Sequence, residues 1–226
     1  MAELADATDS KSVGLRPIGV RPPVPAPLFF FYKHQMLNNE FYAQLKSAIA
    51  SGNAKALEAI SSDIDMAVIE TGLFPEERFE SILAVFQDRQ FLGLKGSWKL
   101  IRVFEQNWHE LSEAQRSELL PALEASYESF DDWMACFVIS GILGEQYQDQ
   151  RALSVLQRLK TCANEIPRSF VPHGLEHIAG GSVDPELVTE ALTELKKMEL
   201  DSSEVVRKEV HESFSRLSKQ QIDRLP

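Results

Sequence analysis

Cysteine and long apolar runs are scarce or missing in this chain of 226 residues. The two cysteines, Cys136 and Cys162, stand in apolar helical stretches, where cysteine packs as a small hydrophobe. Two such residues make no disulfide framework, so a reducing compartment is expected. No run of about 18 apolar residues occurs, which excludes a membrane-spanning helix. The stretch MAELADATDSKSVG lacks the apolar core of a signal peptide, so we expect a cytoplasmic protein without a membrane partner.

Basic residues are also in deficit. The chain has 23 Lys and Arg against 34 Asp and Glu, a formal net charge of −11. Such a surface repels nucleic acid and charged membranes, and it attracts a partner with a basic surface. With 44% hydrophobic and 25% charged residues, the composition is that of an ordinary globular protein.

The sequence before residue 73 divides into two parts. Residues 1–37 form a Pro-rich arm, because RPIGVRPPVPAP lacks many backbone donors and favours extended conformations. The LFFFY that follows is too apolar to stay in water, and we expect it to dock onto the body of the protein or onto a partner. Residues 38–72 have the pattern of short lead-in helices: NNEFYAQLKSAIASG, ended by Gly52, then NAKALEAISS, then DIDMAVIETG.

From residue 73 onward, helix boundary signals recur at a regular spacing. Helices are predicted to open at Pro75, Ser112, Asp149 and Asp184, with successive spacings of 37, 37 and 35 residues. Ser112 is followed three residues later by a glutamine, which completes a capping box. The partner helices are predicted to start near four further residues: Ser97, Asp131, Pro167 and Ser202.

Helix pairs at this spacing are typical of an α-solenoid, and no stretch has the alternating pattern of a strand. Three segments resemble HEAT repeats: LGEQYQDQRALSVLQRL (143–159), DSSEVVRKEVHESFSRL (201–217) and LLPALEASYESFDD (119–132). The resemblance is best over residues 112–217. It implies an all-α, right-handed α-solenoid of about four helix pairs in residues 73–226, whose second helices line the concave face.

The stretch DWMACFVISGIL is apolar nearly all round, which predicts a fully buried helix in the middle of the array. The LGEQYQDQ around its end predicts that this helix stops at Gly144. A short polar step is then expected before the next helix opens at Asp149.

The sharpest chemical motif is HGLEH, His173 to His177. It fits H-x-x-E-H, in which two histidines one helical turn apart bind zinc beside a glutamate. With Leu175 on the buried stripe, both histidines fall on the opposite, exposed side. The motif makes His173 and His177 weak metal candidates, and a metal-dependent enzyme is one alternative function. Because no third ligand is identifiable, we expect surface histidines, no metal and no cofactor.

A second alternative is nucleic-acid binding, as in HEAT-like DNA glycosylases, which need a basic concave surface. The stretch GLKGSWKLIR, which contains Trp98, Lys99 and Arg102, is a small basic and aromatic cluster. On an acidic chain it is more typical of the solvated face of an amphipathic helix. Nucleic acid is therefore not the expected partner.

The preferred interpretation is a non-catalytic protein-binding module of the adaptor or inhibitor type, not an enzyme. One concrete version is a bacterial immunity protein that neutralises a cognate toxin with a basic surface. Trp98 is a candidate anchor, unless it packs into the core against Phe91 or Leu92. We predict that His173→Glu and Lys208→Glu weaken binding without changing the melting temperature. The residues expected on the concave face are Trp98, Lys99, Arg102, Asp132, His173, His177, Glu204, Lys208 and Glu212.

Overall fold

The computed structural model describes residues 40–217. The Pro-rich arm and the LFFFY segment predicted for residues 1–37 therefore lie outside the described residues. Within 40–217 the chain is helical and has no strand, so the predicted all-α class is confirmed for this part. None of these helices is long and apolar enough to cross a membrane. The α-helices are α2 (Glu40–Ala50), α3 (Ala54–Thr71), α4 (Glu76–Val85), α5 (Arg89–Leu92), α6 (Trp98–Gln106), α7 (Glu113–Ser126), α8 (Trp133–Gly141), α9 (Gln150–Leu159), α10 (Glu165–Ser169), α11 (Val171–Gly181), α12 (Pro185–Met198) and α13 (Glu204–Arg216).

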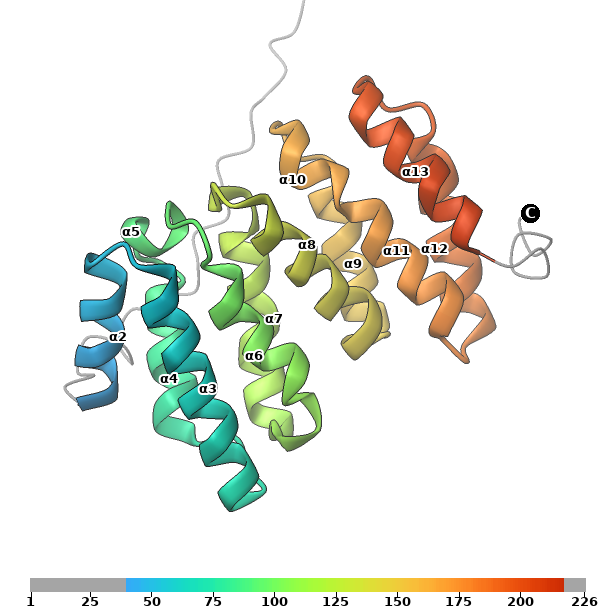
Figure 1. Ribbon diagram of the computed structural model, residues 1–226. Coiled ribbons are helices and arrows are strands. Elements are labelled where there is room, and N and C mark those ends of the chain that lie inside the picture. Colours follow the sequence, from blue (N-terminus) through green and yellow to red (C-terminus); the bar gives the residue numbers. More distant parts are fainter. Residues whose placement is uncertain (1–39, 218–226) are drawn as a thin grey trace, which may run out of the picture.

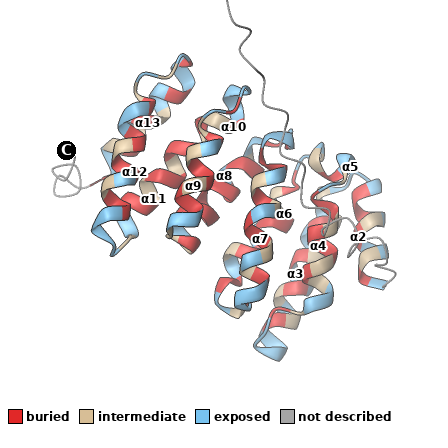
Figure 2. Cartoon of the chain, turned by 180° about the vertical axis from the view of Figure 1, so that it is seen from behind, coloured by how far each residue is buried: buried red, intermediate tan, exposed pale blue. Residues whose placement is uncertain are grey.

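The longer helices form two rows. Helices α2, α4, α7, α9 and α12 contact one another in that order, and we call them the first row. Helices α3, α6, α8, α11 and α13 do the same and form the second row. Figure 1 shows both rows running along the long axis of the molecule in chain order. Buried residues follow both rows in Figure 2, and they make one hydrophobic core.

The helix starts predicted for the first row are confirmed. Ser112 caps α7, and its side chain and that of Gln115 form the complete capping box. The side chain of Asp149 accepts a hydrogen bond from the backbone of α9, and that of Asp184 does the same for α12. Pro75 stands directly before α4. A carboxylate or hydroxyl oxygen at the N-cap satisfies backbone N–H groups that have no partner within the helix.

The starts of the second row lie within a few residues of their predicted positions. Ser97 precedes α6, whereas the caps of α8 and α13 are Asp132 and Ser203, each one residue beyond the predicted start. Pro167 lies inside the short helix α10, and the long helix α11 begins only at Val171.

The two short helices predicted between residues 54 and 71 are wrong, because this segment is the single 18-residue helix α3. The polar run around Ser61 and Ser62 has the composition of a break. The hydroxyl of Ser61 donates to the carbonyl of Leu57, and that of Ser62 donates to the carbonyl of Glu58, each one turn earlier. These bonds are made within the helix, so the two serines do not interrupt it. The helix ends at Gly72, whose φ of 68° fits a left-handed cap.

The prediction of a fully buried helix at DWMACFVISGIL is also wrong. Trp133 and Phe137 of α8 are 54% and 37% exposed. The helix does not stop at Gly144 either, since a π-helix, η3 (Ile142–Tyr147), continues α8. Gln148 then takes a left-handed φ of 43° and turns the chain toward α9.

Two glycines let α11 approach η3 very closely. An ideal Cβ on Gly144 would lie 2.2 Å from the carbonyl oxygen of Gly174, which no side chain tolerates. A Cβ on Gly174 would lie 2.8 Å from both the carbonyl oxygen of Ser140 and Cδ2 of Leu156. The pair therefore brings the backbones of α8, η3 and α11 together, and it sets the spacing of the side chains that α8 and α11 present to solvent.

Candidate protein-binding surface

A continuous set of rings, two of them exposed and three partly buried, runs across α8 and the start of α11, and we call it the aromatic strip. It consists of Trp133 and Phe137 of α8, Phe170 between α10 and α11, and His173 and His177 of α11. Trp133 and Phe137 are four residues apart, and so are the two histidines, so each pair lies on one face of its helix. Because α8 and α11 are in contact, the two pairs stand side by side.

The rings of the strip contact one another from end to end. Trp133 stacks on Phe170 with centroids 5.9 Å apart, and Phe137 meets Phe170 edge to face at 6.1 Å. Phe137 stacks on His173 at 4.3 Å, and His173 meets His177 at 4.5 Å, nearly at a right angle. Both kinds of contact are favourable aromatic geometries. The strip is thus a preformed surface whose large rings lose little conformational freedom on binding.

Acidic residues flank the strip along the chain. Asp131 is exposed two residues before Trp133, and its Oδ2 lies beside Gly93 at the end of α5. At the other end, Glu105 of α6 is close enough to His177 and to Glu145 of η3 to interact electrostatically with both. Burial is the main cause that raises the pKa of Glu105, and repulsion from Glu145 adds to it. Arg102 is the cation nearest to Glu105, with its Nε 3.7 Å from the carboxylate.

His173 is largely buried, which corrects the prediction that it is exposed. Burial is the main cause that lowers its pKa to about 4, and His177 and Arg216 lower it further. The ring is therefore neutral at neutral pH and packs as part of the aromatic stack. A glutamate at this position would bring a charge into a desolvated place, so the prediction that His173→Glu leaves the melting temperature unchanged is wrong.

The surroundings of the two histidines differ from those of a zinc site. The ring of His173 stacks on Phe137, and the ring of His177 meets that of His173 edge to face. Among residues 40–217, no group of three His, Cys, Asp or Glu side chains could hold a metal ion. A zinc site needs at least three protein ligands around one point. The HGLEH motif here builds an aromatic stack instead.

The basic and aromatic cluster of α6 is largely engaged within the protein. Trp98 is half-buried and packs against the hydrophobic core, which fits the core-packing alternative. The Lys99 ammonium lies 5.7 Å from the centre of the Trp98 ring and forms an ion pair with Glu58 of α3. Arg102 is exposed. Lys99 and Arg102 each stand beside a carboxylate, that of Glu58 and that of Glu105, which weakens their attraction for a phosphate backbone.

Asp132 is not a groove residue, so that prediction is wrong. The residue is buried, and its Oδ1 accepts a hydrogen bond from the backbone N–H of Met134 in the first turn of α8. Its Oδ2 accepts a second hydrogen bond, 2.6 Å long, from the backbone N–H of Gly96. Both oxygens are thus used to hold the start of α8 against the loop before α6.

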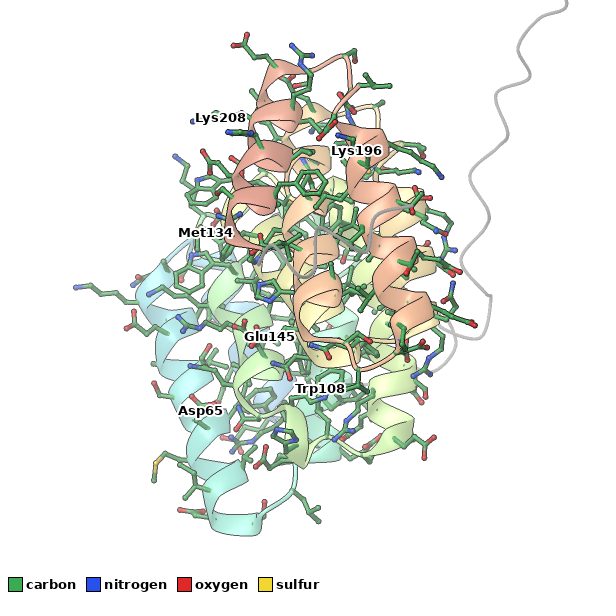
Figure 3. The ribbon with its side chains drawn as sticks, turned by 90° about the vertical axis from the view of Figure 1, so that its right-hand side faces the viewer. Asp65, Trp108, Met134, Glu145, Lys196 and Lys208 are labelled. Carbon is green, nitrogen blue, oxygen red and sulfur yellow. The ribbon has the colours of Figure 1, made fainter. Side chains whose placement is uncertain are left out.

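The three residues predicted on α13 lie at the far end of the second row. Glu204 is exposed, Lys208 is 72% exposed, and Lys208 stands 3.6 Å from Glu212. Figure 3 shows Lys208 of α13 and Met134 of α8 on the same side of the molecule. Helix α13 packs against α11, and the Arg216–Glu176 ion pair of 2.8 Å also joins the two helices.

A polar hollow of about 300 Å³ lies elsewhere, at the start of α7 beside η3. Arg151 pairs with Asp149, and one terminal nitrogen of Arg116 donates to the carbonyl of Trp108. The buried Nε of Arg116 has no hydrogen-bond partner among the described residues. The hollow is lined by Trp108, Glu113, Arg116, Ser117, Gln146, Tyr147, Asp149 and Arg151.

Sequence reasoning missed the three most apolar members of the strip: Trp133, Phe137 and Phe170. Their signal is present in the sequence, since Trp133 and Phe137 repeat four residues apart. The buried residues of α8, such as Ala135 and Ile139, already fill one face of that helix.

Comparison of the chain with protein-family models, curated proteins and solved structures gives no match.

Proposed function

We propose that this chain is a non-catalytic protein-binding module that uses the second row, and above all the aromatic strip, as its binding surface. The observation that carries the proposal is the exposure of Trp133 and Phe137 beside Phe170 in one preformed stack. Clustered exposed aromatic rings are typical of protein-binding hot spots, because each ring buries a large area when a partner covers it. Trp133 is the proposed anchor in place of Trp98.

The charge of the body supports a basic protein as the partner. Residues 40–217 carry 17 Lys and Arg against 30 Asp and Glu, a net charge of −13. Asp131 and Glu145 are exposed acidic residues that flank the strip along the chain. Opposite charges would speed association and orient the partner, whereas the same charge would repel nucleic acid.

The regular order of the helices supports a HEAT-like, right-handed solenoid as the scaffold. Two rows of helices in chain order, with caps at Ser112, Asp149 and Asp184, are what such a scaffold requires. In a solenoid of this kind the second row would line the concave face. The strip would then lie in the groove, where a partner can contact several helices at once.

Adaptor or inhibitor work suits such a surface, and neutralising a toxin with a basic surface is one form of it. The two cysteines are free and buried, and because burial raises the pKa of both thiols, neither is a candidate nucleophile.

Affinity capture from the native host tests the proposal. The full chain is compared with Phe137→Ser and with Val183→Ser, a matched change of an exposed apolar residue in the loop between α11 and α12, outside both rows. We expect one protein with a basic surface to be captured by the wild type and by Val183→Ser, and to be lost with Phe137→Ser. Equal capture by all three chains would refute the strip as the binding surface.

A further inference from the structure

The aromatic strip has no covering element among the described residues, although its rings are apolar and partly exposed. Along α8 and η3, the strip and its flanking carboxylates extend from Asp131 to Glu145. At a rise of 1.5 Å per residue this is roughly 20 Å. A ligand that matches the strip is therefore about seven residues of extended chain, at about 3.1 Å per residue.

The sequence outside the described residues contains a segment of this length and of suitable chemistry. Residues 21–27 read RPPVPAP, which is seven residues with four prolines, one arginine and no acid. Proline-rich segments dock into grooves lined by aromatic side chains, because the polyproline conformation is already ordered before binding. Trp133, Phe137 and Phe170 are rings of the kind that receive prolines, and the exposed Asp131 is a carboxylate for the arginine.

The charges of the two parts are complementary. Residues 10–39 contain four Lys and Arg and no acidic residue, whereas residues 40–217 have a net charge of −13. Attraction between them would favour binding of the segment to the acidic body over release into solvent.

The chain is long enough to reach the strip. The path from Glu40 of α2 passes α3 and α6 to α8, three helix spacings of about 10 Å each, or roughly 30 Å. Twelve residues lie between position 27 and Glu40, and the thirteen Cα-to-Cα steps from 27 to 40 span up to about 43 Å when extended. A tether of this length also gives the segment an effective concentration on the order of millimolar.

We propose that the aromatic strip binds residues 21–27 of the same chain. The inference concerns the strip to which the proposed function assigns the partner, and it adds regulation of that site. An external partner must displace the segment, so a chain whose segment cannot bind takes up the partner several-fold more tightly.

Fluorine NMR on the full chain tests the inference. The chain has three tryptophans, Trp98, Trp108 and Trp133, so 5-fluorotryptophan gives three signals, and Trp133→Phe assigns one of them. The change in chemical shift between H2O and D2O reports how far each ring is exposed. The test variant is Arg21→Glu with Pro22→Ala and Pro25→Ala, and the matched control is Lys11→Glu.

We expect the Trp133 signal of the wild type and of Lys11→Glu to have a small solvent shift. In the triple variant this shift should rise at least twofold, while Trp98 and Trp108 stay constant. A synthetic peptide of residues 19–29, added to the triple variant, should reverse the rise.

A large Trp133 solvent shift in the wild type, unchanged in the triple variant, would overturn the inference. Protection that disappears on dilution would overturn it too, because the occupant would then be a second copy. The outcome is independent of the capture experiment. An uncovered strip can still bind a partner, and a strip covered by residues 21–27 can exist in a chain that captures none.

Discussion

Acid should destabilise this protein through His173. Its pKa is lowered to about 4 from the ordinary value of 6.5, so the folded state holds the ring neutral. As the pH falls below 6.5 the unfolded chain binds the proton first, and the free energy of unfolding decreases until the pH reaches about 4. For this group alone, the loss between pH 7.5 and pH 5 is about 2 kcal/mol, and over the full window it is about 3 kcal/mol.

Other groups titrate in the same window, so the effect must be isolated by substitution. The raised pKa of Glu105 acts with the opposite sign, since the folded state then binds a proton more readily than the unfolded chain. Urea unfolding at pH 7.5 and pH 5 should be compared for the wild type, His173→Phe and the exposed control His109→Phe. Phenylalanine keeps a flat ring against Phe137 and cannot titrate.

The expected result is that His173→Phe loses about 2 kcal/mol less stability between the two pH values than the wild type does. The control should behave like the wild type. If all three proteins lose the same free energy of unfolding, His173 is not held neutral by the fold, and the description of its ring as buried within the strip is wrong.

Two pairs of substitutions test the packing beneath the strip by thermal and chemical unfolding. Gly174→Ala should destabilise by about 1–3 kcal/mol, because its Cβ would meet a backbone oxygen at 2.8 Å. A Cβ on Gly141 would make ordinary contacts of 3.7 and 3.8 Å, so Gly141→Ala should leave the free energy of unfolding unchanged or raise it by up to about 1 kcal/mol. Equal losses of stability for the two glycine variants would contradict the close approach of α11. Asp132→Ala should lower the free energy of unfolding by about 1–3 kcal/mol, because it removes the cap of α8 and the hydrogen-bond partner of the Gly96 N–H. The control Asp131→Ala changes an exposed residue and should lower it by less than about 0.5 kcal/mol.

The sequence predicted the features that depend on near neighbours in the chain. A cap such as Ser112 with Gln115 is made within four residues, so its pattern is complete in the sequence. The single helix α3 was missed because composition does not show whether the hydroxyls of Ser61 and Ser62 bond back within the helix. Composition favoured a break there, whereas the buried positions continue from Leu57 to Val68 along one face.

The candidate site was less predictable because it depends on contacts between helices. A helix that is apolar all round gives no sign of which face its neighbours cover, so the exposure of Trp133 and Phe137 was not found. In the sequence, Asp132 cannot be told from an acidic surface residue, because the backbone N–H that it binds belongs to Gly96, 36 residues away. His173 was placed on the outer side of α11, but the ring that covers it belongs to α8.

Site-specific photocrosslinking in the native host tests the central claim, protein binding by the strip, most directly. The photoreactive amino acid p-benzoylphenylalanine replaces either Phe137 in the strip or Glu186, an exposed residue of α12 in the first row. We expect position 137 to crosslink one distinct protein with a basic surface, position 186 not to do so, and Trp133→Ser to abolish the product. Crosslinking of that protein from position 186 alone, or a product unaffected by Trp133→Ser, would show that the strip is not the binding surface.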